Sequence, residues 1–454
     1  MGSDFRPASI GEIAAPIPNA TAAGPFGSNL VSRDYVESGV PVIRGQNLAD
    51  RWIGGEFVYV SQEKAATLRT NTARPGDIVF TQRGTLGQVS LVPADAFPVY
   101  VISQSQMKLT VDPARADSGY VYYACTSSDF IRQVHDNAVA AGVPHINLGT
   151  LRGLRIPLPS LEIQKTIAGT LATLDDRINL LRQTNTTLEA IAQALFKSWF
   201  VDFDPVHAKA EGREPEAIDA ATAALFPSEF EESELGPIPQ GWQVATLSEH
   251  VDAERGLSYK GAGLTSADDG LPMHNLNSVL EGGGYKYAGI KYYNAAYKER
   301  HLVKAGDIIV ANTEQGHHHR LIGFPAIVPH QFTNGIFSHH LYRVRAKKGS
   351  PVSRHWLYYC LMTSAVRDQI IGCSNGSTVN MLKPAGLQIP QMVVPPAKLC
   401  RAFGAIAEDL RTKIEGCIDR AETLAQLRDT LLPRLISGKL RIPEAIEVTE
   451  GIRA

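Results

Sequence analysis

Two stretches of the sequence repeat one pattern at a spacing of 233 residues. Ile146-Asn147-Leu148 leads to Gly153-Leu154-Arg155-Ile156-Pro157, and Val379-Asn380-Met381 leads to Gly386-Leu387-Gln388-Ile389-Pro390. A long segment with apolar residues at helical spacing follows each stretch. If three residues are added to the second connection, the apolar positions of the two segments coincide. The chain is therefore predicted to be a tandem duplication in which each copy ends in a long helix.

The duplication extends upstream of these stretches. Arg74-Pro75-Gly76-Asp77-Ile78-Val79-Phe80 corresponds to Lys304-Ala305-Gly306-Asp307-Ile308-Ile309-Val310 at a nearly equal spacing. A repeat of this length is far longer than the roughly 20 to 50 residues of solenoids and propellers, so each copy is expected to be a globular domain. The fold class is expected to be α+β, with short buried strands at Asp77–Phe80 and Asp307–Val310.

Proline, glycine and charge mark the expected boundaries. The expected domains are a first globular domain at 1–160, a first long helix at 161–205, an acidic linker at 206–235, a second globular domain at 236–395, and a second long helix with the tail at 396–454.

The acidic segment also changes how the net charge is interpreted. Residues 209–234 contain eight acidic and two basic residues, so they carry −6, and because the whole chain carries −2 the remainder sums to +4. Phosphate binding needs lysine and arginine. A mildly positive remainder is compatible with DNA binding in which a partner protein shares the phosphate contacts.

Composition indicates a cytoplasmic protein that does not enter a membrane. The chain is 44% hydrophobic and 20% charged, and no apolar run is long enough to span a bilayer. Its five cysteines are an odd number and form no C-x-x-C pair. We therefore expect free thiols in a reducing compartment.

Both long segments have a heptad pattern that predicts a coiled-coil seam. Asn185 would lie in the apolar seam of the first helix, where a polar residue can fix the alignment of two helices. The alternative is that each apolar stripe packs on its own domain. The predicted seam residues are Ile167, Leu171, Leu174, Ile178, Leu181, Asn185, Leu188, Leu195, Phe403, Leu410, Ile414, Leu424 and Leu431.

Three further stretches make the chain recognisable: Leu195-Phe196-Lys197-Ser198-Trp199-Phe200-Val201-Asp202-Phe203-Asp204-Pro205, Leu235-Gly236-Pro237-Ile238-Pro239-Gln240-Gly241-Trp242, and Leu431-Leu432-Pro433-Arg434-Leu435-Ile436-Ser437-Gly438. Over essentially its whole length the chain resembles the specificity subunit of type I restriction-modification enzymes. The resemblance implies two target-recognition domains and two spacer helices that pair antiparallel with pseudo-two-fold symmetry. It also implies a bipartite double-stranded DNA target, two adenine-N6 methyltransferase subunits, and endonuclease/translocase subunits as partners.

The sequence itself indicates no catalysis, no cofactor and no metal site. It lacks an Asn/Asp-Pro-Pro-aromatic motif for amino methylation, a G-x-x-x-x-G-K-[ST] phosphate loop and an H-E-x-x-H motif. The run His317-His318-His319 does not predict zinc, because consecutive side chains diverge and no spaced Cys or His completes a tetrahedral set.

Polar loop residues are the candidates for reading bases, because arginine and lysine recognise guanine, and asparagine and glutamine recognise adenine. Some of them could instead form turns or contact phosphates. Residues that differ between the copies are the better specificity candidates, so unlike half-sites and an asymmetric target are expected. The candidates are Arg44, Gln46, Asn47, Gln82, Arg83, Gln104, Gln106, His145, Lys260, His274, Asn275, Asn312, Gln315, His317, His318, Arg320, His339, Asn375 and Ser377.

Two other functions remain open on the sequence alone. One is a DNA-targeting module of the same build that serves another defence partner. The other is a coiled-coil adaptor whose domains bind protein, which the weak positive charge allows. DNA binding that falls steeply with salt would favour DNA recognition over the adaptor.

Overall fold

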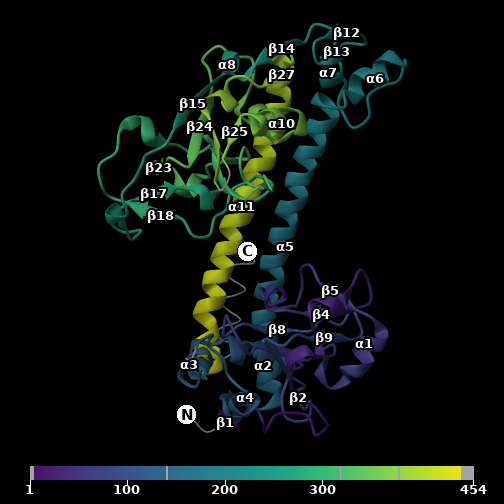
Figure 1. Ribbon diagram of the computed structural model, residues 1–454, viewed down its shortest axis with the longest axis vertical. Coiled ribbons are helices and arrows are strands. Elements are labelled where there is room, and N and C mark those ends of the chain that lie inside the picture. Colours follow the sequence, from purple (N-terminus) through teal and green to yellow (C-terminus); the bar gives the residue numbers. More distant parts are fainter. Residues whose placement is uncertain (1–4, 140–141, 317, 377–378, 441–454) are drawn as a thin grey trace. The chain divides into compact units, whose positions relative to one another are not determined.

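Two long helices, α5 (Leu161–Phe200) and α11 (Ala397–Ile436), contain 40 residues each and begin 236 positions apart in the chain. Figure 1 shows both as continuous helices in the computed structural model, which describes residues 5–139, 142–316, 318–376 and 379–440. The chain divides into two compact units: unit 1 contains residues 1–181 and 420–454, and unit 2 contains residues 182–419. Each unit therefore includes part of each long helix.

Unit 1 is built on two main sheets. One has the strand order β2-β10-β7-β8 and is antiparallel, and the other has the order β3-β5-β4-β9-β6 with one parallel pair, β4 and β9. The strands are β1 (Arg6–Ser9), β2 (Thr21–Ala23), β3 (Tyr35–Val36), β4 (Val40–Ile43), β5 (Val58–Val60), β6 (Thr72–Ala73), β7 (Ile78–Thr81), β8 (Val89–Leu91), β9 (Tyr100–Ile102), β10 (Gln106–Leu109) and β11 (Arg155–Leu158). The shorter helices are α1 (Gln62–Thr67), α2 (Ser118–Thr126), α3 (Ser128–Asp136) and α4 (Leu148–Gly153).

Unit 2 repeats this plan. Its main sheets have the orders β15-β24-β20-β22 and β16-β18-β17-β23-β19, again with one parallel pair, β17 and β23. The strands are β12 (Phe230–Ser233), β13 (Gly236–Pro239), β14 (Gln243–Thr246), β15 (Val251–Arg255), β16 (Leu264–Thr265), β17 (Leu271–His274), β18 (Lys291–Tyr293), β19 (Leu302–Val303), β20 (Ile308–Ala311), β21 (Thr313–Gln315), β22 (Pro325–Ile327), β23 (Gly335–Phe337), β24 (Leu341–Ala346), β25 (Ser374–Asn375), β26 (Val379–Leu382) and β27 (Gln391–Val394). The shorter helices are α6 (Asp204–Ala210), α7 (Ala220–Ala223), α8 (Leu247–His250), α9 (Arg354–Met362) and α10 (Ser364–Gly372). The predicted duplication and the mixed α and β class are confirmed.

A glycine-aspartate turn starts the central strand of each antiparallel sheet. Gly76 and Gly306 both have a φ of +85°, a left-handed conformation that favours glycine. Asp77 and Asp307 follow, and each carboxylate accepts a hydrogen bond from the backbone N–H three residues earlier, at 2.9 and 2.8 Å. Every residue of the strands that follow, β7 and β20, is buried. The predicted strands are therefore present, each shifted by one residue.

The alignment of the two copies differs from the one that the repeated letters suggest. The N–H of Ile146 donates to Gln82 O at 3.0 Å, and the matching bond in unit 2 runs from Leu382 to Asn312 O at 2.8 Å. The true spacing is therefore already 236 here, as it is in the long helices, and Asn147 does not correspond to Asn380. The sequence alignment paired similar residue types at a constant spacing of 233. Equivalent backbone hydrogen bonds show which residues of the two copies correspond in the structure.

The two long helices run antiparallel within unit 1. Asp175 of α5 contacts Arg428 of α11, whereas Pro157, which precedes α5, lies with Pro433 and Ile436 near the end of α11. Residues later in α5 therefore contact residues earlier in α11. This direction agrees with the predicted pairing.

A polar network joins α11, α5 and α2 in unit 1. Arg428 donates from Nη1 to Asp175 Oδ1 at 2.7 Å, and the hydroxyl of Tyr123 donates to Asp175 Oδ2 at 2.7 Å. Arg51 donates to the oxygen of Tyr123 at 3.3 Å and pairs with Asp176 at 2.7 Å. Because the side chain of Asp175 is only 9% exposed, its charge would be costly to bury without these partners.

Most of the predicted seam residues lie in or beside the domain cores, whereas the half-buried Leu188 and the buried Ile414 belong to no core cluster of the described residues. In unit 1 the apolar seam residues pack in one cluster with the strands and with α2, and in unit 2 Phe403 belongs to a similar cluster. Leu424 and Leu431 of α11 pack in the cluster of unit 1, and Leu195 of α5 packs against the cluster of unit 2, so neither stripe packs only on the domain that precedes it in the chain. Asn185 has a buried Oδ1 without a hydrogen-bond partner among the described residues, so its contacts give no support to a role in alignment.

The acidic segment of unit 2 contains ordered structure. It includes α7 and β12, and the ring of Phe226 packs edge-on against Trp199 of α5 with centroids 5.4 Å apart. The expected domain boundaries stay a prediction. Among the helices of the described residues, none is both long and apolar enough to cross a bilayer. The five cysteines are free.

One glycine in each unit allows a close crossing of two backbone segments. A Cβ on Gly24 would overlap the carbonyl oxygen of Ser103, and a Cβ on Gly256 would overlap the carbonyl oxygens of Phe337 and Ser338. The chain that leaves β2 or β15 therefore lies directly on the turn before β10 or β24. Only glycine leaves room at this crossing.

Replacing Gly256 by alanine is expected to destabilise unit 2 by about 2 to 3 kcal/mol, because the overlapping atoms are backbone atoms that cannot move aside. Urea unfolding monitored by tryptophan fluorescence measures this change. Gly261→Ala is the matched control, since no described atom lies within 4 Å of a Cβ at that position. Equal midpoints for the two variants would show that the crossing is not tight.

Candidate nucleic-acid interface

Three polar loops of unit 1 are held together by backbone hydrogen bonds. The N–H of Ser103 donates to Ile43 O at 3.0 Å, which joins the turn before β10 to the end of β4. The N–H of Gln82 donates to Ser105 O at 2.7 Å, and Gln82 O accepts from Ile146 at 3.0 Å. Gln82 thus occupies the centre, between the turn before β10 and the segment that leads into α4.

The same bonds recur in unit 2. The N–H of Ser338 donates to His274 O at 2.8 Å, and the N–H of Asn312 donates to His340 O at 3.0 Å. Asn312 O accepts from Leu382 at 2.8 Å. Asn312 is therefore the counterpart of Gln82, although the sequence around the two residues differs.

These equivalent loops carry unlike side chains on one backbone framework. The bonds above align Ser103 with Ser338, so Gln104 corresponds to His339, and Ser105 to His340. A shared framework with different hydrogen-bonding groups is suited to reading two different base sequences.

The first copy's candidates differ in exposure. Gln46, Arg83 and Gln104 are exposed, Arg44, Gln82 and His145 are half-buried, and Asn47 and Gln106 are buried. Asn47 supports its own loop, because its Nδ2 donates to the carbonyls of Gly54 and Glu56 at 2.8 and 3.0 Å. Asn47 and Gln106 are therefore placed to shape the loops rather than to reach a base.

Arg83 is an exposed cation in the loop cluster of unit 1. Its backbone bridges to His145, and its N–H donates to Ser105 O at 3.3 Å, so the loop that carries it is anchored on both sides. Within the described residues its guanidinium has neither a hydrogen-bond nor an ion-pair partner. The side chain is exposed and free to bind a base edge or a phosphate.

Polar atoms without partners gather in these loops. Such atoms are costly when buried, typically by about 1 to 3 kcal/mol each, so they call for a water or a ligand. In unit 1 they include Gln82 Oε1, Gln106 Nε2 and Arg44 Nε. In unit 2 they include Asn312 Oδ1, Ser338 Oγ and His339 Nδ1.

Unit 2 opens a cleft of about 880 Å³ beside the same loops. Its lining combines polar and charged side chains with apolar ones, and it includes the predicted residues Asn275 and Gln315. Lys286 and Lys291 supply positive charge that suits phosphate groups, and Glu281 and Glu314 supply two negative charges to the same lining. Other lining residues are Tyr259, Asn277, Thr313 and His340.

Glu314 shapes this cleft, because its carboxylate is bound to backbone N–H groups of the neighbouring loop. Its oxygens accept from the backbone N–H groups of Arg320 at 2.9 Å and of Leu321 and Ile322 at 3.0 Å each. Burial alone would raise the pKa of Glu314, but these bonds outweigh burial and the pKa is lowered. The carboxylate is therefore an ionised clamp for the loop before β22.

The remaining candidates of unit 2 occupy varied positions. Lys260, Gln315, His318, Arg320 and Asn375 are exposed, His339 is half-buried, and His274, Asn275 and Asn312 are buried. Asn312 donates from Nδ2 to His339 O at 2.9 Å, so its amide is partly engaged. The candidates His317 and Ser377 lie outside the described residues.

His274 is a core histidine of unit 2. Its Nδ1 accepts from the hydroxyl of Tyr285 at 2.9 Å, and its Nε2 donates to Phe332 O at 3.2 Å. Burial lowers the pKa of His274 to about 4. The ring is therefore neutral at physiological pH and placed to support β17 rather than to contact DNA.

Two features were not anticipated from the sequence. The glycine crossing at Gly24 and Gly256 gives no local signal apart from a glycine just beyond a strand. The network around Asp175 has a weak sequence signal, which is an arginine at position 428 in an otherwise apolar heptad stripe. Among the described residues no group of three or more His, Cys, Asp or Glu side chains could hold a metal ion.

Comparisons with a family model and with known proteins all find similarity to specificity subunits of type I restriction enzymes. Residues 31–190 match the family model described as type I restriction modification DNA specificity domain. The chain is 24% identical over 428 residues to the type I restriction enzyme MjaIX specificity subunit of Methanocaldococcus jannaschii, covering 91% of this chain and 89% of that protein. It is 25% identical over 342 residues to the HindI specificity subunit of Haemophilus influenzae, covering 65% and 71%.

A solved structure shares the fold. The S subunit of a type I restriction-modification system from M. genitalium superposes with a TM-score of 0.52 at 17% identity, covering 96% of this chain and 97% of that one.

The low pKa of His274 predicts a pH-dependent stability of unit 2. The unfolded histidine binds a proton near pH 6.5 and the folded one only near pH 4, so stability is complete above pH 6.5 and falls as the pH drops towards 4. Between pH 7 and pH 5 the loss from this group is about 2 kcal/mol. Urea midpoints of the unchanged chain and of His274→Gln at both pH values measure it. If the variant loses as much stability as the unchanged chain over this range, the assignment fails.

Proposed function

Because the chain belongs to the family of type I restriction-modification specificity subunits, we propose that it selects a double-stranded DNA target for a methyltransferase and endonuclease complex. Each globular domain reads one half of a bipartite site. The proposed target-recognition domains are residues 1–160 and 236–395, with the first spacer helix at 161–205, a linker at 206–235, and the second spacer helix with the C-terminal tail at 396–454.

The observation that carries this proposal is the repeated loop framework with unlike side chains. The same backbone hydrogen bonds hold Gln82 in unit 1 and Asn312 in unit 2. Two copies of one reader with different contact groups predict two different half-sites, and so an asymmetric target. In unit 1 the exposed candidates Gln46, Arg83 and Gln104 would contact the DNA. In unit 2 they are Lys260, Gln315, His318, Arg320 and Asn375.

The chain does no catalysis by itself in this proposal. It carries none of the motifs for methyl transfer or nucleotide hydrolysis sought above, so two methyltransferase subunits and the endonuclease/translocase subunits supply the chemistry. A net charge of −2 implies that these partners share the phosphate contacts. Binding by the chain alone should therefore be weaker and less salt-dependent than binding by the assembled complex.

Co-expression with its methyltransferase subunit, followed by mapping of N6-methyladenine across the host DNA, tests the proposal. A gapped and asymmetric motif that is methylated only when this chain is present is the expected result. A palindromic motif would contradict the unlike half-sites. If the two proteins associate and no methylation appears, a targeting module for another partner replaces this proposal.

Arg83→Ala is expected to weaken binding of the mapped target by about 5- to 100-fold, which corresponds to the roughly 1 to 3 kcal/mol of a base contact. The loss should fall on the half-site read by unit 1 and should relax the sequence preference there. Fluorescence anisotropy with targets altered in one half-site measures both effects. Arg6→Ala is the matched control, since Arg6 is an exposed arginine on β1, a strand outside the loop cluster. An equal loss in the control would assign Arg83 to general charge.

A further inference from the structure

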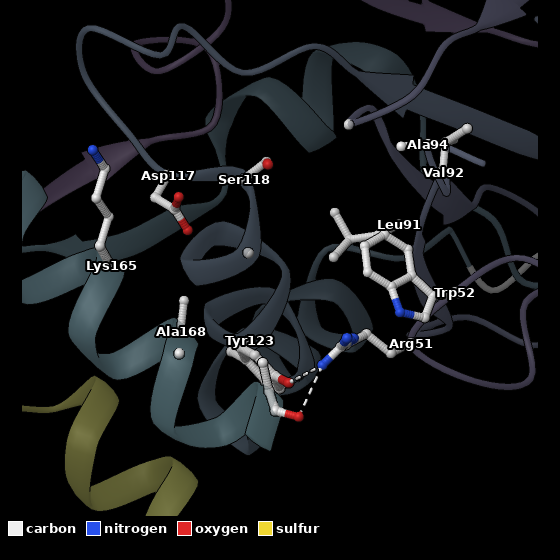
Figure 2. A pocket seen from close by; sticks show the side chains of 14 residues that line it. Arg51, Trp52, Leu91, Val92, Ala94, Asp117, Ser118, Tyr123, Lys165 and Ala168 are labelled. Carbon is white, nitrogen blue, oxygen red and sulfur yellow. Dashed lines mark hydrogen bonds between the residues drawn. The ribbon is translucent and has the colours of Figure 1, made fainter. Parts of the chain in front are cut away.

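A groove of about 390 Å³ lies in unit 1 between α2 and the first part of α5, and Figure 2 shows it from close by. Small residues of the two helices line it, and Arg51, Trp52 and Leu91 lie opposite them in Figure 2. Trp52 is 38% exposed, and the guanidinium of Arg51 lies over its ring, 4.9 Å from the centroid. The small residues are Gly119 on α2 and Ala168, Gly169 and Ala172 on α5.

Unit 2 fills the corresponding space with its own side chains. The constant spacing of 236 residues relates α2 to α9 and α5 to α11. Ser118, Gly119 and Ala172 of unit 1 thus correspond to Arg354, His355 and Glu408 of unit 2. Arg354 and His355 both pair with Glu408, the histidine through its Nε2 at 2.6 Å.

The glycine turns of the two sheets mark the same difference. A Cβ on Gly306 would overlap the guanidinium of Arg354, so that side chain lies directly on the turn. Gly76 has the same backbone conformation, and no described atom lies within 4 Å of a Cβ built there. Unit 1 therefore keeps the backbone framework, but it has small residues at the positions that Arg354, His355 and Glu408 occupy in unit 2.

Unit 1 places a carboxylate at this groove where unit 2 has a hydroxyl. Asp117 caps α2 through Oδ1, which accepts from the N–H of Tyr120 at 2.9 Å, whereas the equivalent cap of α9 is Ser353. Asp117 Oδ2 has no hydrogen-bond partner among the described residues. The nearby guanidinium of Arg51 is already engaged by Asp176 and by a carbonyl of α5. Lys165 also lines the groove beside Asp117 (Figure 2), but no ion pair joins these two side chains among the described residues.

Resting on the function proposed above, we propose that this groove docks one methyltransferase subunit, which inserts an arginine or lysine side chain where Arg354 lies in unit 2. Asp117 receives the inserted charge, and Trp52 packs on the aliphatic stem. Exposed tryptophan beside small apolar residues is typical of protein interfaces. A phosphate backbone would gain little from the apolar walls formed by Leu91, Val92 and the alanines.

The assembly with two methyltransferase subunits is expected to be asymmetric. The docking groove belongs to unit 1, and its counterpart in unit 2 is filled by Arg354 and Glu408. The two methyltransferase subunits should therefore bind this chain with unequal affinities. The one that docks on unit 1 should depend on Asp117.

The test transfers the filler of unit 2 into unit 1. Ser118→Arg with Ala172→Glu recreates the ion pair that the equivalent backbone already holds in unit 2, so the double variant should fold. Isothermal titration calorimetry and sedimentation with the methyltransferase subunit should show one of two binding events weakened at least 10-fold. Ser38→Arg with Thr70→Glu adds the same two side chains at exposed positions of unit 1 and is the matched control. Two binding events of unchanged affinity in the filled variant would overturn the proposal.

A second variant tests the inserted charge. Asp117→Asn keeps the helix cap, because asparagine caps as well as aspartate, but removes the negative charge. The same binding event should weaken about 10-fold, and an unchanged affinity would overturn the insertion of a cation. If the filled variant binds the methyltransferase normally and loses DNA affinity, the groove is a nucleic-acid surface and the proposal is wrong.

The proposed function has a separate outcome in the same experiment. If the unchanged chain binds neither the methyltransferase subunit nor DNA, the function fails and the docking inference falls with it. If the unchanged chain binds both and directs methylation while the filled variant also binds both, only the docking inference fails.

Discussion

The ion pair between the half-buried Arg428 and the buried carboxylate of Asp175 is the contact on which unit 1 depends most. It joins the last part of α11 to α5, and the hydroxyl of Tyr123 extends it to α2. A buried carboxylate without partners costs several kcal/mol, so this pair allows few alternative alignments of the two helices. Burial, and then the Asp175 carboxylate, raise the pKa of Tyr123, which keeps its hydroxyl a donor. Since residues 420–440 complete the core around residues 5–181, the domain requires a segment that the chain supplies last.

Duplication followed by divergence accounts for both of the surfaces that we propose to bind DNA or a partner protein. The backbone framework around Gln82 and Asn312 is shared, and the side chains on it differ, which is what two unlike half-sites require. The groove in unit 1 has the same origin, because small residues replace the Arg354 and Glu408 pair of the other copy. Comparing equivalent positions within one chain therefore separates the residues that build the scaffold from those that face a partner.

The limits of the sequence are visible at particular residues. Asn47, Gln106 and His274 have the types expected of base readers, yet each is buried, since type does not tell which way a loop residue points. The repeated letters at a spacing of 233 gave an alignment three residues short of the spacing set by hydrogen bonds. Arg83 is among the candidates that the structure leaves accessible. The buried residues His274 and Asn312 also differ from their counterparts Ile43 and Gln82, so a difference between the copies does not by itself mark an accessible residue.

The sequence by itself determined the tandem duplication, the two long helices, the short buried strands after each glycine-aspartate turn, and the absence of known catalytic motifs. These are properties of local pattern and period, which neighbouring residues encode directly. Only the tertiary structure decided the helix alignment, the glycine crossings, the convergence of the loops and the open groove. Each of these depends on residues far apart in the chain that meet through packing and charge pairing, and no local pattern records such meetings.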